Sequence, residues 1–186
     1  LLSGNWKFRF FPSVEDVTEA FYLPGYDVSG FDTIPVPGMW QNYGYDKHQY
    51  TNVRYPFPFD PPFVPHDTPC GLYNRTFSYR PDGMRRHLYF EGVDSCFYVW
   101  VNGNLIGYSQ IAHATSEFDI TDYVISGENS FKISVDNRPT AYVSPIDNCG
   151  DFTKMGGIYR KLRLVEVDDT HIDLEDYGSS GVYIST

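Results

Sequence analysis

The sequence predicts an all-β fold in which two antiparallel sheets pack against each other as a sandwich. Short segments alternate apolar and polar side chains with a period of two, an Asn-Gly pair lies between two such segments, and turn-forming clusters separate the rest. Aromatic residues make up 18% of the chain, and they favour strands because they pack well on a pleated surface. Many short strands with regular turns are typical of β-sandwiches.

The expected strands follow from this alternation. The most regular one contains Phe131, Ile133 and Val135, which alternate with Lys132 and Ser134 and therefore predict one buried face. In chain order, the pattern predicts strands at 6–11, 33–36, 73–79, 87–91, 95–101, 105–109, 117–120, 132–137 and 158–167.

Turn chemistry supports the connections between these strands. The run SCFYVWV at 95–101 ends at Asn102-Gly103, a pair that favours the type I′ turn of a hairpin. Residues 105–109 are therefore expected to return beside 95–101. Short helical turns are expected at 13–21, where Ser13 can act as the N-cap, and at 121–125.

The composition restricts the partners of the protein. With 186 residues, 41% of them hydrophobic and 20% charged, the chain suits one globular domain. A formal net charge of −10 repels phosphate backbones, so nucleic acid is not expected as a partner. No run of 18 apolar residues occurs, so no membrane partner is expected. Localisation stays open between periplasmic, extracellular and cytoplasmic sites.

Cysteine and histidine spacings predict no metal site in this chain. The chain has three cysteines, Cys70, Cys96 and Cys149, and an odd number cannot all pair in disulfides. They form no CxxC pair, so a structural zinc site has no support. Cys96 falls within an expected strand, where a small buried apolar residue fits. The histidines also lack ligand spacing.

Residues 35–69 are rich in proline and aromatic residues and show almost no strand alternation. A loop of this length within a compact domain is usually functional, although it can also plug one end of the sandwich. Both interpretations stay open. Packing is favoured for Trp40, with stacking on a sugar ring as the alternative, and an exposed pair of Tyr43 and Tyr45 is a second aromatic candidate.

Three segments carry a resemblance to a known family: SGNWKFRF at 3–10, VPGMWQNYGYDKHQYTNVRYPFPFDPPFVP at 36–65 and DFTKMGGIYRKLRL at 151–164. In this order they resemble the amino-terminal sugar-binding domain of glycoside hydrolase family 2, most closely its β-galactosidases, over nearly the whole chain. The resemblance implies a jelly-roll β-sandwich like the galactose-binding domains. It also implies a sugar-binding domain at 1–167, followed at 168–186 by a linker and the first strand of a truncated immunoglobulin-like domain.

The resemblance implies that this chain is a non-catalytic part of a β-galactosidase-type enzyme. Retaining hydrolysis needs two carboxyl groups about 5 Å apart. In this family both are glutamates on a later (β/α)₈ barrel, so the fragment alone is expected to be inactive. It would support the barrel and lend side chains to the sugar pocket. The alternatives are an independent carbohydrate-binding module, or the same domain of a β-glucuronidase or β-mannosidase.

Four residues are expected to contact substrate. Asn52 and Asp151 resemble family residues that reach the sugar, and an amide or carboxylate suits hydroxyl groups. Asp136 and Asn137 are a polar pair at the end of a strand, with local hydrogen bonding as the alternative. Asn52 could instead cap a turn, and Asp151 could bind backbone amides.

Some family members carry a longer Arg-Trp-Ser-Asp segment, whose aspartate helps to hold a metal ion. This chain does not match that aspartate, so no cofactor is expected in the fragment and a metal ion in the complete enzyme stays open. The expected partners are a β-galactoside substrate and the remaining domains of the same chain.

Overall fold

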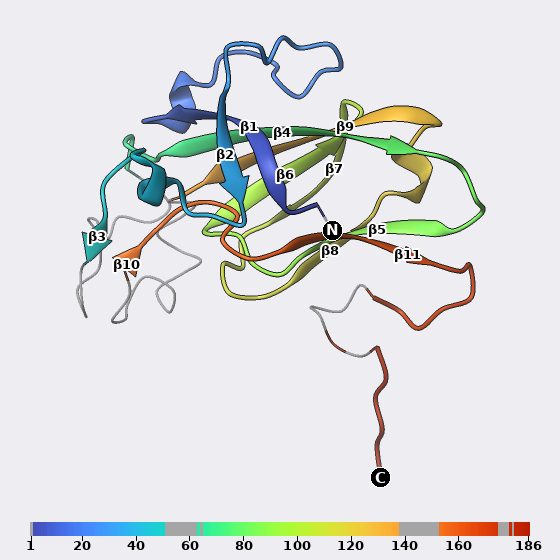
Figure 1. The fold of residues 1–186 in the computed structure, drawn as a ribbon. Coiled ribbons are helices and arrows are strands. Elements are labelled where there is room, and N and C mark those ends of the chain that lie inside the picture. The colour runs from blue at the N-terminus through green and yellow to red at the C-terminus, as the bar shows by residue number, and fades with distance from the viewer. Residues whose placement is uncertain (1, 51–62, 64, 138–152, 175–178, 180) are drawn as a thin grey trace.

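The computed structural model describes residues 2–50, 63, 65–137, 153–174, 179 and 181–186. They form two packed antiparallel sheets, which confirms the predicted β-sandwich (Figure 1). Within these residues the larger sheet has the strand order β2 (Asp32–Val36), β1 (Gly4–Phe11), β4 (Cys70–Tyr79), β9 (Gly127–Asp136), β6 (Cys96–Val101), β7 (Asn104–Ser109). The smaller sheet has the order β11 (Leu162–Val167), β5 (Arg85–Phe90), β8 (Ser116–Asp119).

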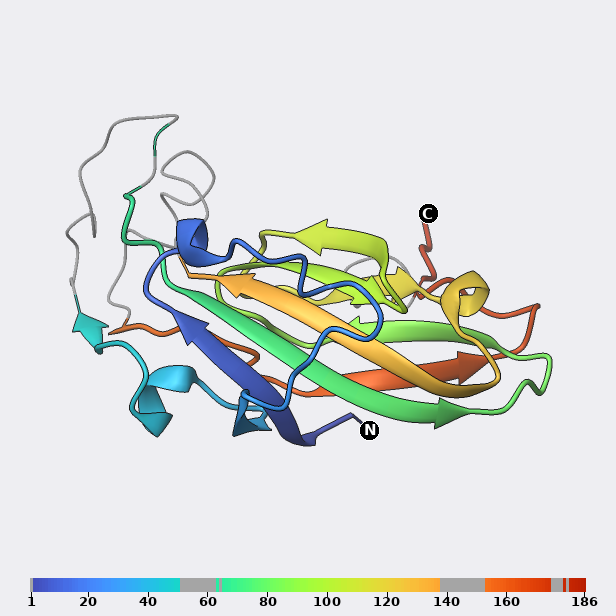
Figure 2. The same cartoon turned by 90° about the horizontal axis from the view of Figure 1, so that it is seen from above.

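A two-stranded ladder of β3 (Gln49–Tyr50) and β10 (Thr153–Lys154) lies beyond one end of the sandwich. Figure 2 shows that the arrow of β9 ends toward the same side as β3 and β10. Residues 35–50, the first part of the aromatic and proline-rich segment, lead to this end. They therefore cover one end of the sandwich.

The core lies between the two sheets. It takes the inward-facing residues of each strand, including the fully buried Phe8, Val99 and Val135. Fully burying one such side chain contributes roughly 1.5–3 kcal/mol, so the alternation seen in the sequence is the main reason for this fold. Trp6, on β1, also belongs to the core, and its indole N–H donates to the carbonyl of Leu2 at 3.0 Å.

A second apolar cluster lies on the outer face of the larger sheet. The chain between β1 and β2 crosses this face and buries Phe21 and Phe31 against Cys70 and Leu72 of β4. Lys132 of β9 fastens the crossing segment, because its ammonium group donates to the carbonyls of Phe21 at 2.6 Å and Leu23 at 2.8 Å.

The β6–β7 hairpin confirms the turn prediction. Asn102 has φ 50° and Gly103 has φ 84°, as the two central residues of a type I′ turn require. The side chain of Asn102 also donates to Asn129 at 2.8 Å and to the carbonyl of Tyr123 at 2.9 Å. The hairpin is therefore tied to the start of β9 and to the turn before it.

Several expected elements differ from the structure in their bounds; the strand expected at 132–137, for example, is β9, which begins at Gly127. The strand predicted at 158–167 begins only at Leu162, because the preceding backbone bonds to loops instead, as with Ile158 O and Gly38 N at 2.8 Å. The turn predicted at 13–21 is a 3₁₀ turn, η1 (Val14–Asp16), since the residues after it lie over the sheet. The turn predicted at 121–125 is likewise shorter, η3 (Thr121–Tyr123).

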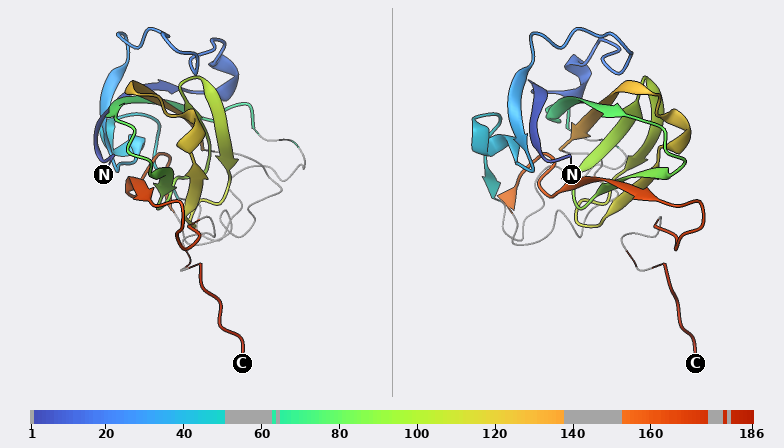
Figure 3. Two further views of the ribbon diagram at one scale, coloured as in Figure 1. Left: turned by 90° about the vertical axis from the view of Figure 1, so that its right-hand side faces the viewer. Right: turned by 45° about the vertical axis from the view of Figure 1, so that its right-hand side comes forward.

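Beyond Val167 the described residues form no helix or strand. Val182, Tyr183 and Ile184 are 52%, 78% and 87% exposed, and Figure 3 shows this segment leading away from the sandwich. The described part of the chain contains no helix long and apolar enough to cross a membrane.

Candidate functional site

Asp136 is the last residue of β9, and Asn137 follows it at a bend of the chain. Phe131, Ile133 and Val135 of the same strand point into the core, so the alternation sends Asp136 to the outer face of the larger sheet. The sequence predicted both residues as sugar contacts.

The carboxylate of Asp136 lies between two thiols. Asp136 pairs in register with Cys70 on one side and with Cys96 on the other, and the Sγ of Cys96 is 4.0 Å from its Oδ2. The hydroxyl of Ser134 is 3.5 Å from Oδ1. Burial raises the pKa of Asp136, because the charged form loses hydration there. The carboxylate is thus an acceptor in a weakly polar setting, where a donor such as a hydroxyl would be bound strongly.

Asn137 is buried, with 6% of its surface exposed. Its backbone N–H donates to the carbonyl of Pro69 at 3.0 Å, and its carbonyl accepts from the hydroxyl of Ser95 at 3.0 Å. Its side-chain Oδ1 has no hydrogen-bond partner among the described residues. An unused buried acceptor is costly, so this atom is complementary to a hydroxyl or amide donor.

Asp94 and Ser95 connect the end of β9 to the segment after β10. Ser95 N–H donates to the carbonyl of Asp136 at 3.3 Å, and the backbone of Asp94 exchanges two hydrogen bonds with Gly157, at 3.0 and 2.9 Å. Sequence reasoning assigned no role to Asp94 or Ser95. The signal that could have found them is the polar Asp94-Ser95 pair between two apolar runs, of which only Ser95 lies within an expected strand.

Gly156 and Gly157 allow a close approach of the backbone to neighbouring segments. A Cβ on Gly157 would lie 2.9 Å from the carbonyl oxygen of Gly38, and its φ of 126° also favours glycine. The N–H of Gly156 donates to the side chain of Gln41 at 2.9 Å, and its carbonyl accepts from the N–H of Trp40 at 3.1 Å. This part of the DFTKMGGIYR segment is held against η2 (Trp40–Tyr43).

Trp40 is fully buried, at 0% exposure. Its ring packs on Phe8 at 6.3 Å and on Phe10 at 5.9 Å between centroids, so the favoured packing role is confirmed and no face is free to stack on a sugar. Tyr43 is 46% exposed, whereas Tyr45 packs edge-on against Phe8 at 5.0 Å. Tyr43 and Tyr45 therefore do not form the exposed pair considered from the sequence.

The β3–β10 ladder flanks the two residues on which the resemblance placed most weight. It pairs Tyr50 with Thr153, and Asn52 follows the first by two residues while Asp151 precedes the second by two. Asn52 and Asp151 themselves lie outside the described residues, so their expected roles stay predictions. Among the residues that the structure covers, no group of three or more histidine, cysteine, aspartate or glutamate side chains could hold a metal ion.

The fold is a jelly-roll β-sandwich, an architecture that lectin domains share with proteins of other functions. The family match agrees with this class. The family described as glycosyl hydrolases family 2, sugar binding domain, matches residues 1–168, so the chain belongs to glycosyl hydrolase family 2 and is its sugar-binding domain.

Curated relatives and solved structures extend this assignment. The chain is 45% identical over 172 residues to a β-galactosidase of Actinobacillus pleuropneumoniae, a match that covers 92% of this chain and 16% of the relative. It is 49% identical over 137 residues to a β-galactosidase of Staphylococcus xylosus, which covers 73% of this chain and 13% of the relative. The chain thus spans about a sixth or less of these relatives.

Among solved structures, a calcium-binding mutant of β-glucuronidase 2 from Bacteroides uniformis matches with a TM-score of 0.71. Its sequence identity is 23%, and the match covers 96% of this chain and 19% of that chain. At this identity the likeness shows the fold alone.

Proposed function

We propose that this domain belongs to a β-galactosidase-type hydrolase, in which it supports a catalytic barrel and lends side chains to the sugar pocket. The observation that carries the proposal is the 45% identity to a β-galactosidase over 92% of the chain. The β-glucuronidase neighbours support the fold but not that specificity, because their identity is only 23%. The proposed substrates are terminal β-galactosides.

We assign the lent side chains to the end of the sandwich where β9, β3 and β10 lie. The unused acceptor of Asn137 and the buried carboxylate of Asp136 support this assignment. Asn52 and Asp151 each stand two residues along the sequence from the β3–β10 ladder, after Tyr50 and before Thr153. Hydrolysis itself is assigned to glutamates in the rest of the protein.

The test uses the complete protein with nitrophenyl β-galactoside and nitrophenyl β-glucuronide as substrates. The proposal expects turnover of the galactoside and little of the glucuronide, and the reverse preference would reject it. Asn52→Ala and Asp151→Ala should each lower kcat/KM for the galactoside by roughly 10- to 100-fold. This is the usual effect of losing one hydrogen bond in which a partner carries a full or a developing charge. Asp122→Ala, an exposed residue on η3, is the matched control and should leave kcat/KM unchanged.

A second candidate is an independent carbohydrate-binding module. The exposure of Tyr43 at 46% and of Tyr50 at 61% favours it, since aromatic rings near a polar site can stack on sugars. Such a module would bind sugar without the rest of the chain, and Tyr50→Ala would abolish that binding.

A further inference from the structure

β11 is an edge strand of the smaller sheet, with β5 on one side and no strand on the other among the described residues. In an antiparallel ladder, alternate residues bond to the neighbour and the residues between them turn their N–H and C=O groups away. The carbonyl of Leu162 accepts from the N–H of Leu2 at 2.9 Å, on the side away from β5. By the register of the β11–β5 ladder, Leu164 and Glu166 direct their backbone groups to the same open side.

A groove opens along this edge. It is shallow, open to solvent, and lies between β11 and the end of β4. Its lining is mixed, with the apolar Leu2, Phe77, Leu164 and Val165 beside the polar or charged Ser78, Lys161, Arg163 and Glu166. A sheet of three strands faces a sheet of six in the described part of the chain, so the smaller sheet is too narrow to cover the inner face of the larger one here.

The chain enters the larger sheet through this groove. Leu2 is 6% exposed, its N–H bonds to β11, and its carbonyl accepts from Arg75 at 2.8 Å as well as from Trp6. Gly4 then turns the chain into β1 with φ 130°, a conformation that L side chains rarely adopt. Residues 2–4 are therefore a fixed crossing from the edge of one sheet to the other.

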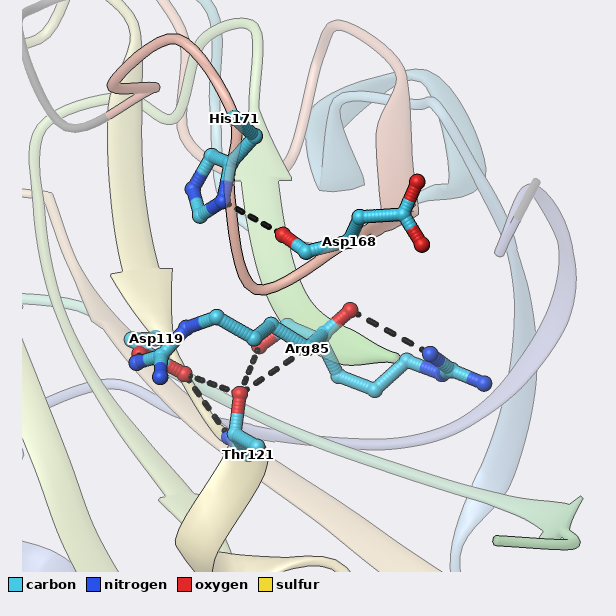
Figure 4. Close-up of polar contacts among 6 residues, drawn as sticks. Arg85, Asp119, Thr121, Asp168 and His171 are labelled. Carbon is cyan, nitrogen blue, oxygen red and sulfur yellow. Dashed lines mark hydrogen bonds and ion pairs between the residues drawn. The ribbon is translucent and has the colours of Figure 1, made fainter. Parts of the chain in front are cut away.

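The described C-terminal segment does not fill the groove. After β11 the carbonyl of Asp168 accepts from the ring of His171 at 2.7 Å, as Figure 4 shows, and His171 stacks edge-on against His87 at 5.6 Å. His87 alternates with the core residue Leu88, so it lies on the outer face of the smaller sheet. The open edge is left to another segment.

We propose that residues preceding this sequence in the complete protein form one further strand on the open edge of β11 and fill the groove. The N–H of Leu2 donates to the carbonyl of Leu162, the first residue of β11. A preceding segment that covers this edge therefore passes Glu166 and then Leu164 before it reaches Leu2. It therefore runs antiparallel to β11. About six residues span the strand at roughly 3.4 Å each, and every second side chain faces Phe77 and Leu164.

The length of the relatives agrees with an occupant from the same chain. This chain spans 16% of the Actinobacillus β-galactosidase, so such proteins contain much chain outside the part seen here. A free strand edge is also a place where strands of other molecules add, and native proteins commonly cover such edges. The proposal does not depend on which sugar the protein binds.

Amide hydrogen exchange measured by mass spectrometry on the complete protein tests the proposal. One form is unaltered, a second lacks the residues before residue 1, and a third replaces them with a Gly-Ser repeat of equal length. We expect the amides of Leu164 and Glu166 to be protected in the first form and to exchange at least 100-fold faster in the other two. The amides of Arg163 and Val165, which face β5, serve as the internal control and stay protected in all three.

Two results would overturn the proposal. Fast exchange at Leu164 and Glu166 in the unaltered protein would show an uncovered edge. Protection that survives the deletion would show that another domain or a second copy covers it, and sedimentation velocity would separate these two occupants.

Discussion

A Cβ atom on Gly156 would lie 2.1 Å from Cζ2 of Trp40. The backbone of Gly156 therefore rests directly on a fully buried indole ring, and two hydrogen bonds to residues 40 and 41 hold it there. This contact fixes the segment that leads back from β10 against the segment that leads toward β3. The position of the proposed sugar site depends on it.

Gly156→Ala is expected to lower the free energy of unfolding by about 1–3 kcal/mol, because an overpacked core must shift a ring or the backbone. Chemical denaturation of the domain measures this. Gly30→Ala is the matched control, since its Cβ would meet nothing within 4 Å and its φ is not in the positive range. Equal stability of the two variants would contradict the packing described for Trp40.

Asp136→Asn is expected to stabilise the domain at neutral pH, because asparagine places no charge in this partly buried site. Burial raises the pKa of Asp136, so its folded-state pKa lies above its unfolded value. Asp136 therefore stabilises the folded state at low pH, where its carboxyl group is protonated. This contribution to the free energy of unfolding is lost as the pH rises through the folded-state pKa. The gain from asparagine should therefore grow from pH 4 to pH 8 in thermal unfolding, and a gain that is constant over this range would contradict the burial effect.

Lys132→Met is expected to destabilise the domain by roughly 1–3 kcal/mol, since two backbone carbonyls lose a charged donor. Burial lowers the pKa of Lys132, because the ammonium group loses hydration there. Limited proteolysis should also cut the segment around Phe21 sooner. Lys47→Met, at an exposed position, is the control, and equal cleavage in both variants would argue against the fastening role.

The thiols of Cys70 and Cys96 are expected to resist modification in the native domain. Burial raises the pKa of Cys96 to about 12 and raises that of Cys70 as well, so little thiolate forms at neutral pH. Cys149 lies outside the described residues, so a Cys149→Ser variant isolates the two. Titration with a thiol reagent at pH 8 should then give no reaction until the protein is unfolded, and rapid labelling of either residue would contradict its burial.

The sequence predicted the strands well because most bury one face, and periodicity reports burial directly. β4 and β9 bury both faces over part of their length, where the segment between β1 and β2 covers them. The register of β9 likewise follows from Phe131, Ile133 and Val135. The end of the sandwich was harder to predict. Nothing periodic distinguishes Trp40, which is buried, from Tyr43, which is exposed, and the link from Asp94 to Gly157 joins residues that are far apart in the sequence. Such contacts follow from tertiary packing, which local patterns do not report.

Calorimetric titration of residues 1–186 with galactose, lactose and a galactan oligosaccharide tests the central claim most directly. A domain that only lends side chains to a pocket completed elsewhere should bind no more tightly than a millimolar Kd, or about −4 kcal/mol. A micromolar Kd for any of the three would contradict this account and would identify the domain as a recognition module in its own right.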